Sequence, residues 1–399
     1  KEKRTELDGA QKIAYYVALN GGEEELNVCA LCGYCSAVCP IYEEIRWESS
    51  SPRGKLFYMK NLLSGKAEQI HPEFINRLFQ CSMCGRCETV CQTKMRISEI
   101  WEIARAEVFE RGLWPEQLRG LGSAVESSGN IFGRLREKSW SLTDEVAKRR
   151  VGKKAKIVYF VGCVSSYMNR FISIPRSFVH IMEKLNLDYT LLGAEERCCG
   201  TPLFSTGGHE KAEKLARHNV KKIEEPGAET VVTTCAGCYR AFKKMYPKIL
   251  NEELPFEVLH SSELLSELIE DGRLKFKNVD KVATYHDPCE LGRRMGAEGV
   301  YEAPRKVIDS IPGLKFIELP KMKVNSTCCG GCGMLKLTNP DLALKMAFKK
   351  LEEARGVGAN VIVSGCASCK LNVTDAVRRA NAKIEFLDLV ELVAVALDV

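Results

Sequence analysis

The strongest chemical signal in this chain is a five-cysteine pattern that occurs twice. Each copy contains a lone cysteine, an adjacent Cys-Cys-Gly and a C-x-x-C pair, and matching positions lie 126 to 131 residues apart. The first five-cysteine set is Cys163, Cys198, Cys199, Cys235 and Cys238, and the second is Cys289, Cys328, Cys329, Cys366 and Cys369. This spacing indicates a duplicated domain. Five thiols exceed the four that a tetrahedral zinc ion or an ordinary cubane uses. The pattern therefore favours an unusual iron–sulfur site and sulfur chemistry, with a zinc site or spare buried thiols as the alternative.

Eight more cysteines form two ferredoxin-like motifs near the N-terminus. They are Cys29, Cys32, Cys35 and Cys39 in the first motif, and Cys81, Cys84, Cys87 and Cys91 in the second. The spacing C-x2-C-x2-C-x3-C is that of two-cluster ferredoxins, in which the fourth cysteine of each motif crosses to the other cluster. This likeness assigns Cys29, Cys32, Cys35 and Cys91 to one cubane, and Cys81, Cys84, Cys87 and Cys39 to the other. A zinc ribbon would leave the third and fourth cysteines unused. Gln92 stands where the motif has proline, which affects the rigidity of the loop more than the ligands.

Composition narrows the class of protein. Nineteen cysteines in 399 residues, grouped as C-x-x-C and C-C, indicate metal binding in a reducing compartment rather than disulfides. The formal charge of +6 comes from Lys and Arg scattered among Asp and Glu, so a nucleic-acid partner is not expected. No apolar run approaches the roughly 18 residues of a membrane span. We expect a cytoplasmic protein that reaches a membrane only through a partner.

The cysteines need a scaffold, and the surrounding sequence predicts one. Short apolar, β-branched runs at 157–161 and 282–285 precede the lone cysteines, and runs at 230–233 and 360–363 precede the C-x-x-C pairs. Such runs are typical of buried parallel strands. With helical patterns between them, they predict α/β units whose cysteines lie on loops at the strand ends. The apolar stretch 386–399 is predicted to form an amphipathic helix.

The predicted architecture is α/β plus a small α+β module. It comprises an N-terminal helical segment (1–27), a two-[4Fe-4S] ferredoxin-like domain (28–105), a helical linker (106–150) and two duplicated α/β domains (151–275 and 276–399).

The complete pattern resembles the CCG domains of the heterodisulfide reductase family. The likeness lies in C-x34-C-C-G-x34-C-x-x-C, in C-x38-C-C-G-x35-C-x-x-C, and in His286-Asp287-Pro288-Cys289. With the ferredoxin-like motifs in front, the chain resembles the D-type member of this family, which fuses the separate C-type and B-type polypeptides. The wider group contains other CCG-domain iron–sulfur oxidoreductases.

The resemblance implies a set of cofactors and a reaction. Each five-cysteine set would hold a noncubane [4Fe-4S] cluster, in addition to the two cubanes, although one of these sets could instead hold zinc. Electrons would pass singly through the cubanes to the paired noncubane clusters, which reduce a disulfide of the coenzyme M–coenzyme B type. Cys332 is the one cysteine left over. It could be an extra ligand or a redox thiol, but the interpretation as a tolerated residue is favoured.

The alternative function is an electron-transfer subunit of a flavoprotein dehydrogenase complex of the glycolate, lactate or glycerol-3-phosphate type, without disulfide chemistry. The chain has neither a G-x-G-x-x-G after a strand nor a P-loop, so a flavin would sit on a partner. We expect a redox partner subunit, either a membrane cytochrome or a flavoprotein, and a small disulfide substrate.

Several polar residues near the cysteines are candidates for second roles. Arg240, Arg293, Arg294 and Lys336 could attract an anionic disulfide, although ordinary surface charge is favoured for each alone. His286 could donate a proton to a product thiolate or hydrogen-bond to a cluster sulfur. A structural hydrogen bond at a strand end is an equal alternative for His286. His260 is the other notable histidine.

Overall fold

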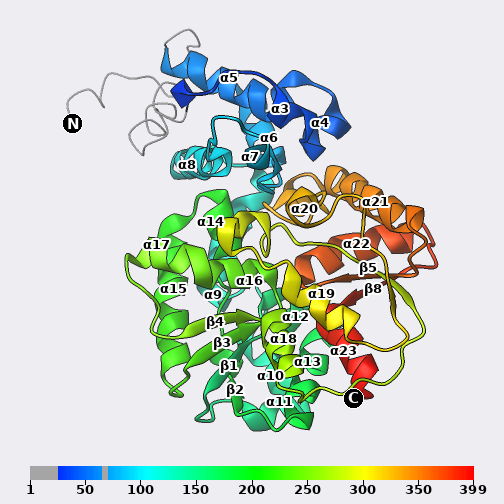
Figure 1. The fold of residues 1–399 in the computed structure, drawn as a ribbon. Coiled ribbons are helices and arrows are strands. Elements are labelled where there is room, and N and C mark those ends of the chain that lie inside the picture. The colour runs from blue at the N-terminus through cyan, green and yellow to red at the C-terminus, as the bar shows by residue number, and fades with distance from the viewer. Residues whose placement is uncertain (1–25, 65–70) are drawn as a thin grey trace. The chain divides into compact units, whose positions relative to one another are not determined.

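The computed structural model describes residues 26–64 and 71–399, which form two compact units (Figure 1). The predicted N-terminal helical segment (1–27) lies almost wholly outside the described residues. Within the described residues, unit 1 contains 26–64, 71–120, 202–209 and 330–346. Unit 2 contains 121–201, 210–329 and 347–399. Two short segments that follow the Cys-Cys-Gly sequences therefore belong to unit 1.

Unit 1 is helical. Its helices are α3 (Tyr34–Ala37), α4 (Pro40–Ile45), α5 (Pro52–Leu63), α6 (Pro72–Gln80), α7 (Arg86–Thr89), α8 (Ile97–Glu110) and α20 (Leu335–Thr338). Prolines begin α4, α5 and α6 because the first helical position needs no backbone N–H. The core packs around Trp101 of α8, with Leu56, Met59 and Phe79. Residues 26–64 and 71–120 contain no strand, so the strands of the predicted α+β module are not found there.

Unit 2 contains two four-stranded parallel sheets. The first has the order β2-β1-β3-β4 and the second β6-β5-β7-β8. Their bounds are β1 (Ile157–Phe160), β2 (Tyr189–Leu191), β3 (Thr230–Thr233), β4 (Glu257–His260), β5 (Val282–Tyr285), β6 (Lys315–Phe316), β7 (Val361–Ser364) and β8 (Glu385–Asp388). The four strands predicted before cysteines are confirmed as β1, β3, β5 and β7. Because the two sheets have matching strand orders, the duplication inferred from the cysteines extends to the fold.

Most of the remaining helices lie in unit 2. They are α9 (Arg119–Ser128), α10 (Trp140–Thr143), α11 (Glu145–Arg150), α12 (Cys163–Tyr167), α13 (Ser173–Lys184), α15 (His209–Glu224), α16 (Ala236–Arg240), α17 (Tyr246–Leu250), α18 (Ser261–Glu270), α19 (Glu302–Asp309), α22 (Ala367–Arg379) and α23 (Leu389–Leu397). Helix α14 (Thr201–Thr206) lies almost wholly in segment 202–209 of unit 1, and α21 (Pro340–Gly356) begins in unit 1 and continues into unit 2. One hydrophobic core runs through both halves, from Tyr159 and Phe178 to Val363 and Val393. The predicted boundary at residues 275 and 276 falls between α18 and β5. It stays a prediction because the two halves share this core.

The prediction for residues 386–399 is partly wrong. This stretch begins inside strand β8, and α23 follows it. Eight residues of α23 are buried, and Val395 is the exposed one, so the helix is a core element rather than an amphipathic one. The mixed α/β class is confirmed. No helix among the described residues is long and apolar enough to cross a membrane.

Candidate metal centres

The five-cysteine sets lie at the carboxyl ends of the two sheets. Cys163 follows β1 and Cys235 follows β3, while Cys289 follows β5 and Cys366 follows β7. Parallel strands end at a common edge, which is where open α/β sheets bind ligands. The sheets therefore gather cysteines that are far apart in the sequence.

Each C-x-x-C pair begins a helix. Cys235 is the N-cap of α16, and Cys366 is the N-cap of α22. Cys238 and Cys369 lie in the first turns of these helices. The partial positive charge at a helix N-terminus favours a thiolate over a thiol. Both pairs are therefore placed as metal ligands would be.

The glycine of each Cys-Cys-Gly sequence has a left-handed backbone. The φ angle is 84° at Gly200 and 82° at Gly330. A side chain in this region costs roughly 1–2 kcal/mol, so glycine suits the turn. A buried asparagine holds the turn from behind in each half. Asn219 donates to the Cys198 carbonyl at 3.2 Å, and Asn372 donates to the Cys329 carbonyl at 2.6 Å.

The thiols of the first set are joined to one another by hydrogen bonds. The bonded pairs are Cys163–Cys198, Cys198–Cys199, Cys199–Cys238 and Cys238–Cys235. Hydrogen bonding to neighbouring sulfurs, followed by burial, raises the pKa of Cys198, Cys199 and Cys238. Hydrogen bonds from neighbouring thiols lower the pKa of Cys235. The structure thus brings all five cysteines of the first set together.

The second set continues this chain of thiols. Its bonded pairs are Cys366–Cys369, Cys369–Cys329 and Cys329–Cys328. Cys289, the fifth member, is buried beyond the end of β5. The two sets meet where the Cys235 thiol hydrogen-bonds to the Cys366 thiol. Nine thiols therefore form one continuous chain within unit 2.

The donor atoms fit iron–sulfur clusters. All nineteen cysteines are free thiols, and nine of the ten in the five-cysteine sets are buried. Soft, clustered thiolates suit iron–sulfur clusters and zinc, whereas Mg²⁺ and Ca²⁺ prefer oxygen ligands. In the second set, ligand atoms of His286, Cys329 and Cys369 lie within 4.8 Å of one another. That mixed nitrogen and sulfur trio is also compatible with zinc.

Cys39, the last cysteine of the first ferredoxin-like motif, interacts electrostatically with cysteines of the second motif. Burial raises the pKa of Cys39 to about 12, and among its other influences are Lys55, which lowers the pKa, and Cys81 and Cys84, which raise it. Burial raises the pKa of Cys87, and the nearby Cys39 makes a small further contribution in the same direction. The structure thus places Cys39 beside the cysteines of the other motif.

The remaining cysteines of these motifs are placed in less detail. Cys29 and Cys32 contribute to the raised pKa of Cys35, whose largest cause is burial. Cys91 has its sulfur 3.3 Å from the Thr93 hydroxyl. The two sets of cubane ligands stay predictions.

The basic residues proposed to attract an anion have contacts within the protein. Buried Arg240 forms an ion pair with buried Glu290 at 3.4 Å. Arg293 donates to the carbonyls of Val324 at 3.0 Å and Ser326 at 2.5 Å. The Arg294 backbone N–H donates to the Cys289 carbonyl at 2.9 Å, and Lys336 lies in α20. The first two arginines therefore have structural roles.

The two notable histidines differ in their surroundings. His260 caps α18, and its Nε2 lies 3.0 Å from the carbonyl oxygen of Gly365, next to Cys366. Burial lowers the pKa of His260 to about 4, so the ring is neutral and structural. His286 is buried, and a nitrogen of its ring lies within 4.8 Å of the Cys329 and Cys369 sulfurs. Cys332 is half-buried in the loop before α20, and its carbonyl accepts from Leu335 N at 3.2 Å.

Sequence reasoning missed a buried ion cluster behind Cys289. Arg305 donates to both carboxylate oxygens of Asp287, at 2.8 and 3.0 Å. It also donates to Glu318 at 2.5 and 3.0 Å. Asp287 lies between β5 and Cys289, so this cluster fixes the loop that carries the cysteine. The acidic residue in His286-Asp287-Pro288-Cys289 was the available signal.

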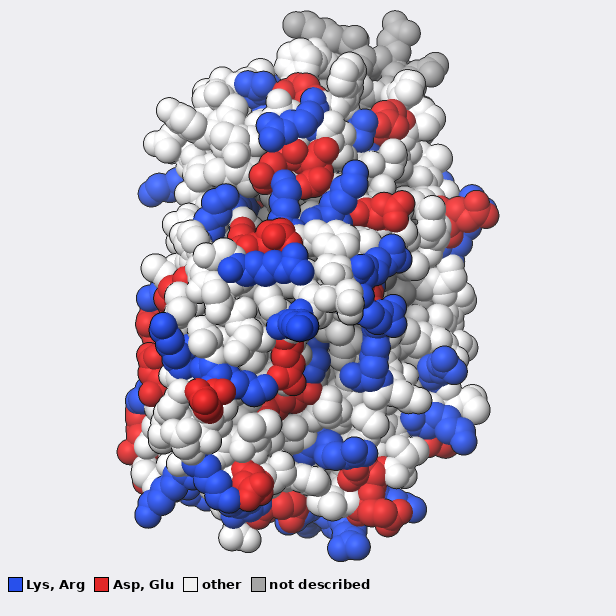
Figure 2. Space-filling model, turned by 90° about the vertical axis from the view of Figure 1, so that its right-hand side faces the viewer, with Lys and Arg blue, Asp and Glu red and all other residues white. Residues whose placement is uncertain are grey.

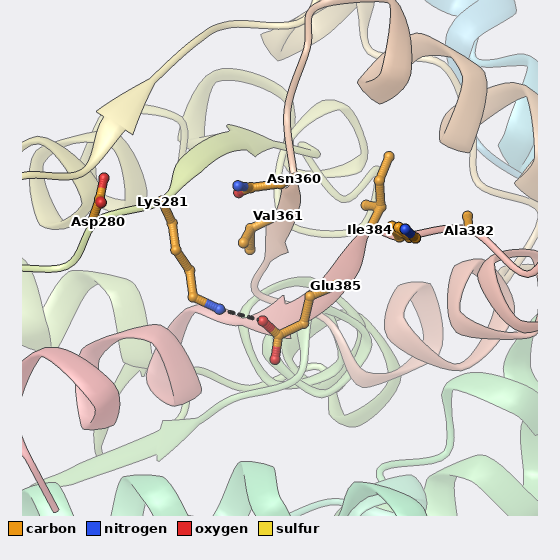
Figure 3. A pocket seen from close by; sticks show the side chains of 8 residues that line it. Asp280, Lys281, Asn360, Val361, Ala382, Ile384 and Glu385 are labelled. Carbon is orange, nitrogen blue, oxygen red and sulfur yellow. Dashed lines mark hydrogen bonds and ion pairs between the residues drawn. The ribbon is translucent and has the colours of Figure 1, made fainter.

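A surface hollow lies away from the cysteines. It has a volume of about 610 Å³ and is lined by residues at the amino ends of β5, β7 and β8 (Figure 3). An ion pair between Lys281 and Glu385, at 2.5 Å, crosses it. Because the cysteines lie at the opposite ends of these strands, the hollow is not part of the candidate centres. On the face shown in Figure 2, charges of both signs are interspersed.

Comparisons with known proteins match both parts of the chain to known families. A 4Fe-4S dicluster domain matches residues 25–95, and a cysteine-rich domain matches residues 157–243 and 283–374. This combination defines an iron–sulfur oxidoreductase of the CCG-domain class. The D subunit of dihydromethanophenazine:CoB–CoM heterodisulfide reductase from Methanosarcina acetivorans is 37% identical over 94% of this chain and 94% of the relative. The chain belongs to the family of heterodisulfide reductase D subunits.

Two more distant relatives have other names. The B subunit of fumarate reductase (CoM/CoB) from Methanothermobacter marburgensis is 28% identical over 94% of this chain and 73% of the relative. EtfAB:quinone oxidoreductase of Syntrophomonas wolfei is 26% identical over 90% of this chain and 56% of the relative. The same architecture is therefore present in proteins named for different reactions.

Proposed function

We propose that this chain reduces a disulfide of the CoB–CoM type at the paired five-cysteine sets, with electrons entering through the ferredoxin-like motifs. The observation that carries the proposal is the contact between Cys235 and Cys366, which joins two matched sets into one site. A disulfide needs two electrons and two protons to give two thiols. A pair of adjacent one-electron sites matches that requirement, whereas a simple relay has no evident need for a pair. The name of the Methanosarcina acetivorans relative supports the same substrate.

Four groups of cysteines would hold the cofactors. One cubane would use Cys29, Cys32, Cys35 and Cys91, and the other would use Cys81, Cys84, Cys87 and Cys39. The two noncubane clusters would use the first and the second five-cysteine sets. When bound, such clusters supply electrons one at a time.

The protein around these groups contributes rigidity and electrostatics. The N-termini of α16 and α22 favour negative charge on sulfur. The His260–Gly365 hydrogen bond and the Arg240–Glu290 ion pair tie the two halves of unit 2 together beside the cysteines. Burial of the thiols keeps water from the centre. The M. acetivorans relative is named as one subunit of its enzyme, which supports a redox partner for this chain.

The second candidate is an electron-transfer subunit without disulfide chemistry. The relative named EtfAB:quinone oxidoreductase favours it, because that name specifies a quinone rather than a disulfide as a reactant. In that case the five-cysteine sets would relay electrons onward to a partner. The two functions differ in whether the isolated chain consumes a disulfide.

Anaerobic purification followed by metal analysis tests the proposal. We expect about sixteen irons for four [4Fe-4S] clusters, and an EPR signal unlike a cubane's that changes when thiol is added. Reduced viologen with CoB–CoM disulfide then tests the reaction directly. Cys235→Ser should abolish turnover, whereas the matched control Cys332→Ser should not. About eight irons with ordinary cubane signals would refute the proposal, and zinc in one set would modify it.

A further inference from the structure

Arg105 in α8 lies outside the candidate centres, yet it joins the loops that lead to them. Its side chain is fully buried, and its hydrogen bonds reach the backbone carbonyls of three separate chain segments, all within unit 1. Nη2 donates to Leu78 and Cys81, each at 2.7 Å. Nη1 donates to Ser205 at 2.8 Å and to Gly333 at 3.2 Å. The guanidinium lies over the ring of Phe79, at 4.8 Å.

The residues that accept these hydrogen bonds belong to, or lie close to, the cysteine motifs in the sequence. Cys81 is the first cysteine of the second ferredoxin-like motif. Ser205 lies six residues after Cys199, and Gly333 lies four residues after Cys329. The chain therefore runs from each Cys-Cys-Gly sequence directly into the unit that contains the ferredoxin-like motifs. One side chain contacts the backbone of a cubane motif and both of these loops.

Two glycines allow the segments that Arg105 contacts to approach one another closely; we call this set of contacts the Arg105 junction. A Cβ atom on Gly333 would lie 2.8 Å from the carbonyl carbon of Ser82 and 2.9 Å from the Cys81 oxygen. A Cβ atom on Gly207 would lie 2.4 Å from the Arg105 oxygen. Heavy atoms this close would force the segments apart. Glycine therefore allows both loops to lie directly on α8 and on the Cys81 loop.

Two further polar contacts hold the second loop in place. The Thr338 hydroxyl donates to the Phe79 carbonyl at 3.3 Å, and the Gln80 amide donates to the Asn339 side chain at 3.3 Å. Phe79 and Gln80, which make these contacts with the 330–346 segment, lie just before Cys81 in the sequence. The junction thus involves both segments, 202–209 and 330–346, that unit 1 receives from the remainder of the chain.

Holding loops together with a buried guanidinium carries a desolvation cost. Only well-placed hydrogen bonds offset the cost of moving the charge out of water, and a packed apolar side chain avoids that cost. Arginine offers instead five donors in a fixed planar fork, so it can bind several carbonyls at once. Hydrogen bonds from a charged donor are also the stronger kind. The residue is therefore suited to a junction whose geometry must be fixed.

We propose that Arg105 is a positioning residue for electron transfer, which links the second ferredoxin-like motif to the loops of both five-cysteine sets. The hydrogen bonds from Cys81 through Arg105 to Gly333 and Ser205 continue along the backbone to Cys329 and Cys199. One electron at a time would leave the reduced cubane of the second motif and reach a five-cysteine set. This inference rests on the proposed function, in which electrons pass in that order.

The test compares Arg105→Gln and Arg105→Lys in the full chain, loaded with iron under anaerobic conditions. Reduced viologen supplies electrons, and rapid-freeze EPR follows the cubane signals and the signals of the five-cysteine sets separately. Arg111→Gln is the matched control, because Arg111 is the C-cap of α8 and pairs with Glu107. We expect cubane reduction to be unchanged. Electron arrival at the five-cysteine sets should slow by about tenfold or more in Arg105→Gln, because a displacement of about 1 Å caused by a remote change can cost a reaction up to about a hundredfold in rate. The effect should be smaller in Arg105→Lys.

A second measurement separates positioning from folding. Hydrogen–deuterium exchange should increase in residues 202–209 and 330–346 of Arg105→Gln, with iron content and the melting temperature close to those of the control. Unchanged transfer with full iron would overturn the inference. The inference would also be overturned if Arg105→Gln and Arg105→Lys both lost cubane iron while the molecules that kept their iron transferred electrons normally. Arg105 would then contribute to folding alone. If the wild-type chain itself passes no electrons to the five-cysteine sets, the proposed function fails instead.

Discussion

Replacing Arg305 with methionine should destabilise unit 2 strongly, because it leaves a buried carboxylate without its cation. Arg305 makes two hydrogen bonds to Asp287, at 2.8 and 3.0 Å, and both side chains are almost fully buried, at 7% and 3% exposure. Glu318 is 31% exposed and can turn to water, so most of the loss falls on Asp287. Breaking such a pair costs about 3–5 kcal/mol. At about 2–4 °C per kcal/mol for a domain of this size, the melting temperature should fall by roughly 6–20 °C.

Calorimetry or circular dichroism under anaerobic conditions measures this change. Arg150→Met is the matched control, because the side chains of Arg150 and its partner Glu183 are each about one-third exposed. Such exposed ion pairs contribute about 0–1 kcal/mol to the free energy of unfolding. Adding Asp287→Asn to Arg305→Met removes the buried charge and should recover part of the loss. Iron should also be lost from the second five-cysteine set first, since Asp287 lies two residues before Cys289. A melting temperature equal to that of the control, or no recovery in the double variant, would refute the reasoning.

Three other changes have expected outcomes. Burial lowers the pKa of His260 to about 4, so between that pH and about 6.5 only the unfolded chain takes up the proton. The contribution of His260 to the free energy of unfolding should therefore be fully present above about pH 6.5 and fall by up to about 3 kcal/mol toward pH 4. Free energies of unfolding from denaturant titrations at several pH values should depend more steeply on pH in the wild type than in His260→Leu. Gly330→Ala places a side chain at φ 82° and should cost about 1–2 kcal/mol and some iron, whereas Gly356→Ala, where a Cβ meets open space, should be neutral in the same melting assay. Cys332→Ser should retain the iron count and EPR spectrum of the wild type, and a lost signal would make Cys332 a ligand.

The strands next to the cysteines were predictable because they are short, continuous and β-branched. β3 and β5 match the predicted bounds, and β1 and β7 differ by one residue. The edge strands β2, β4, β6 and β8 were not predicted, since their sequences lack a continuous apolar run before a motif. β8 was hidden at the start of an apolar stretch that continues into α23. Their places are set by pairing with β1, β3, β5 and β7.

The cysteines themselves were identified from spacing, because ligand chemistry depends on residue type and local spacing. What spacing cannot give is contact between residues far apart in the chain. The contact between Cys235 and Cys366 joins residues 131 positions apart. It exists because two parallel sheets share one core. The Arg305–Asp287 pair and the contacts of Arg105 also join chain segments whose proximity the spacing of the cysteines does not reveal.

The repeated cysteine pattern by itself determined the class of centre, the duplication and the family resemblance. Tertiary structure alone decided that nine of the ten thiols in the two five-cysteine sets form one continuous chain. It also decided that the loops after both Cys-Cys-Gly sequences leave unit 2 and pack in unit 1 around a single buried arginine. The physical reason is that short-range patterns fix which atoms can bind a metal. Long-range packing and burial fix which of those atoms meet.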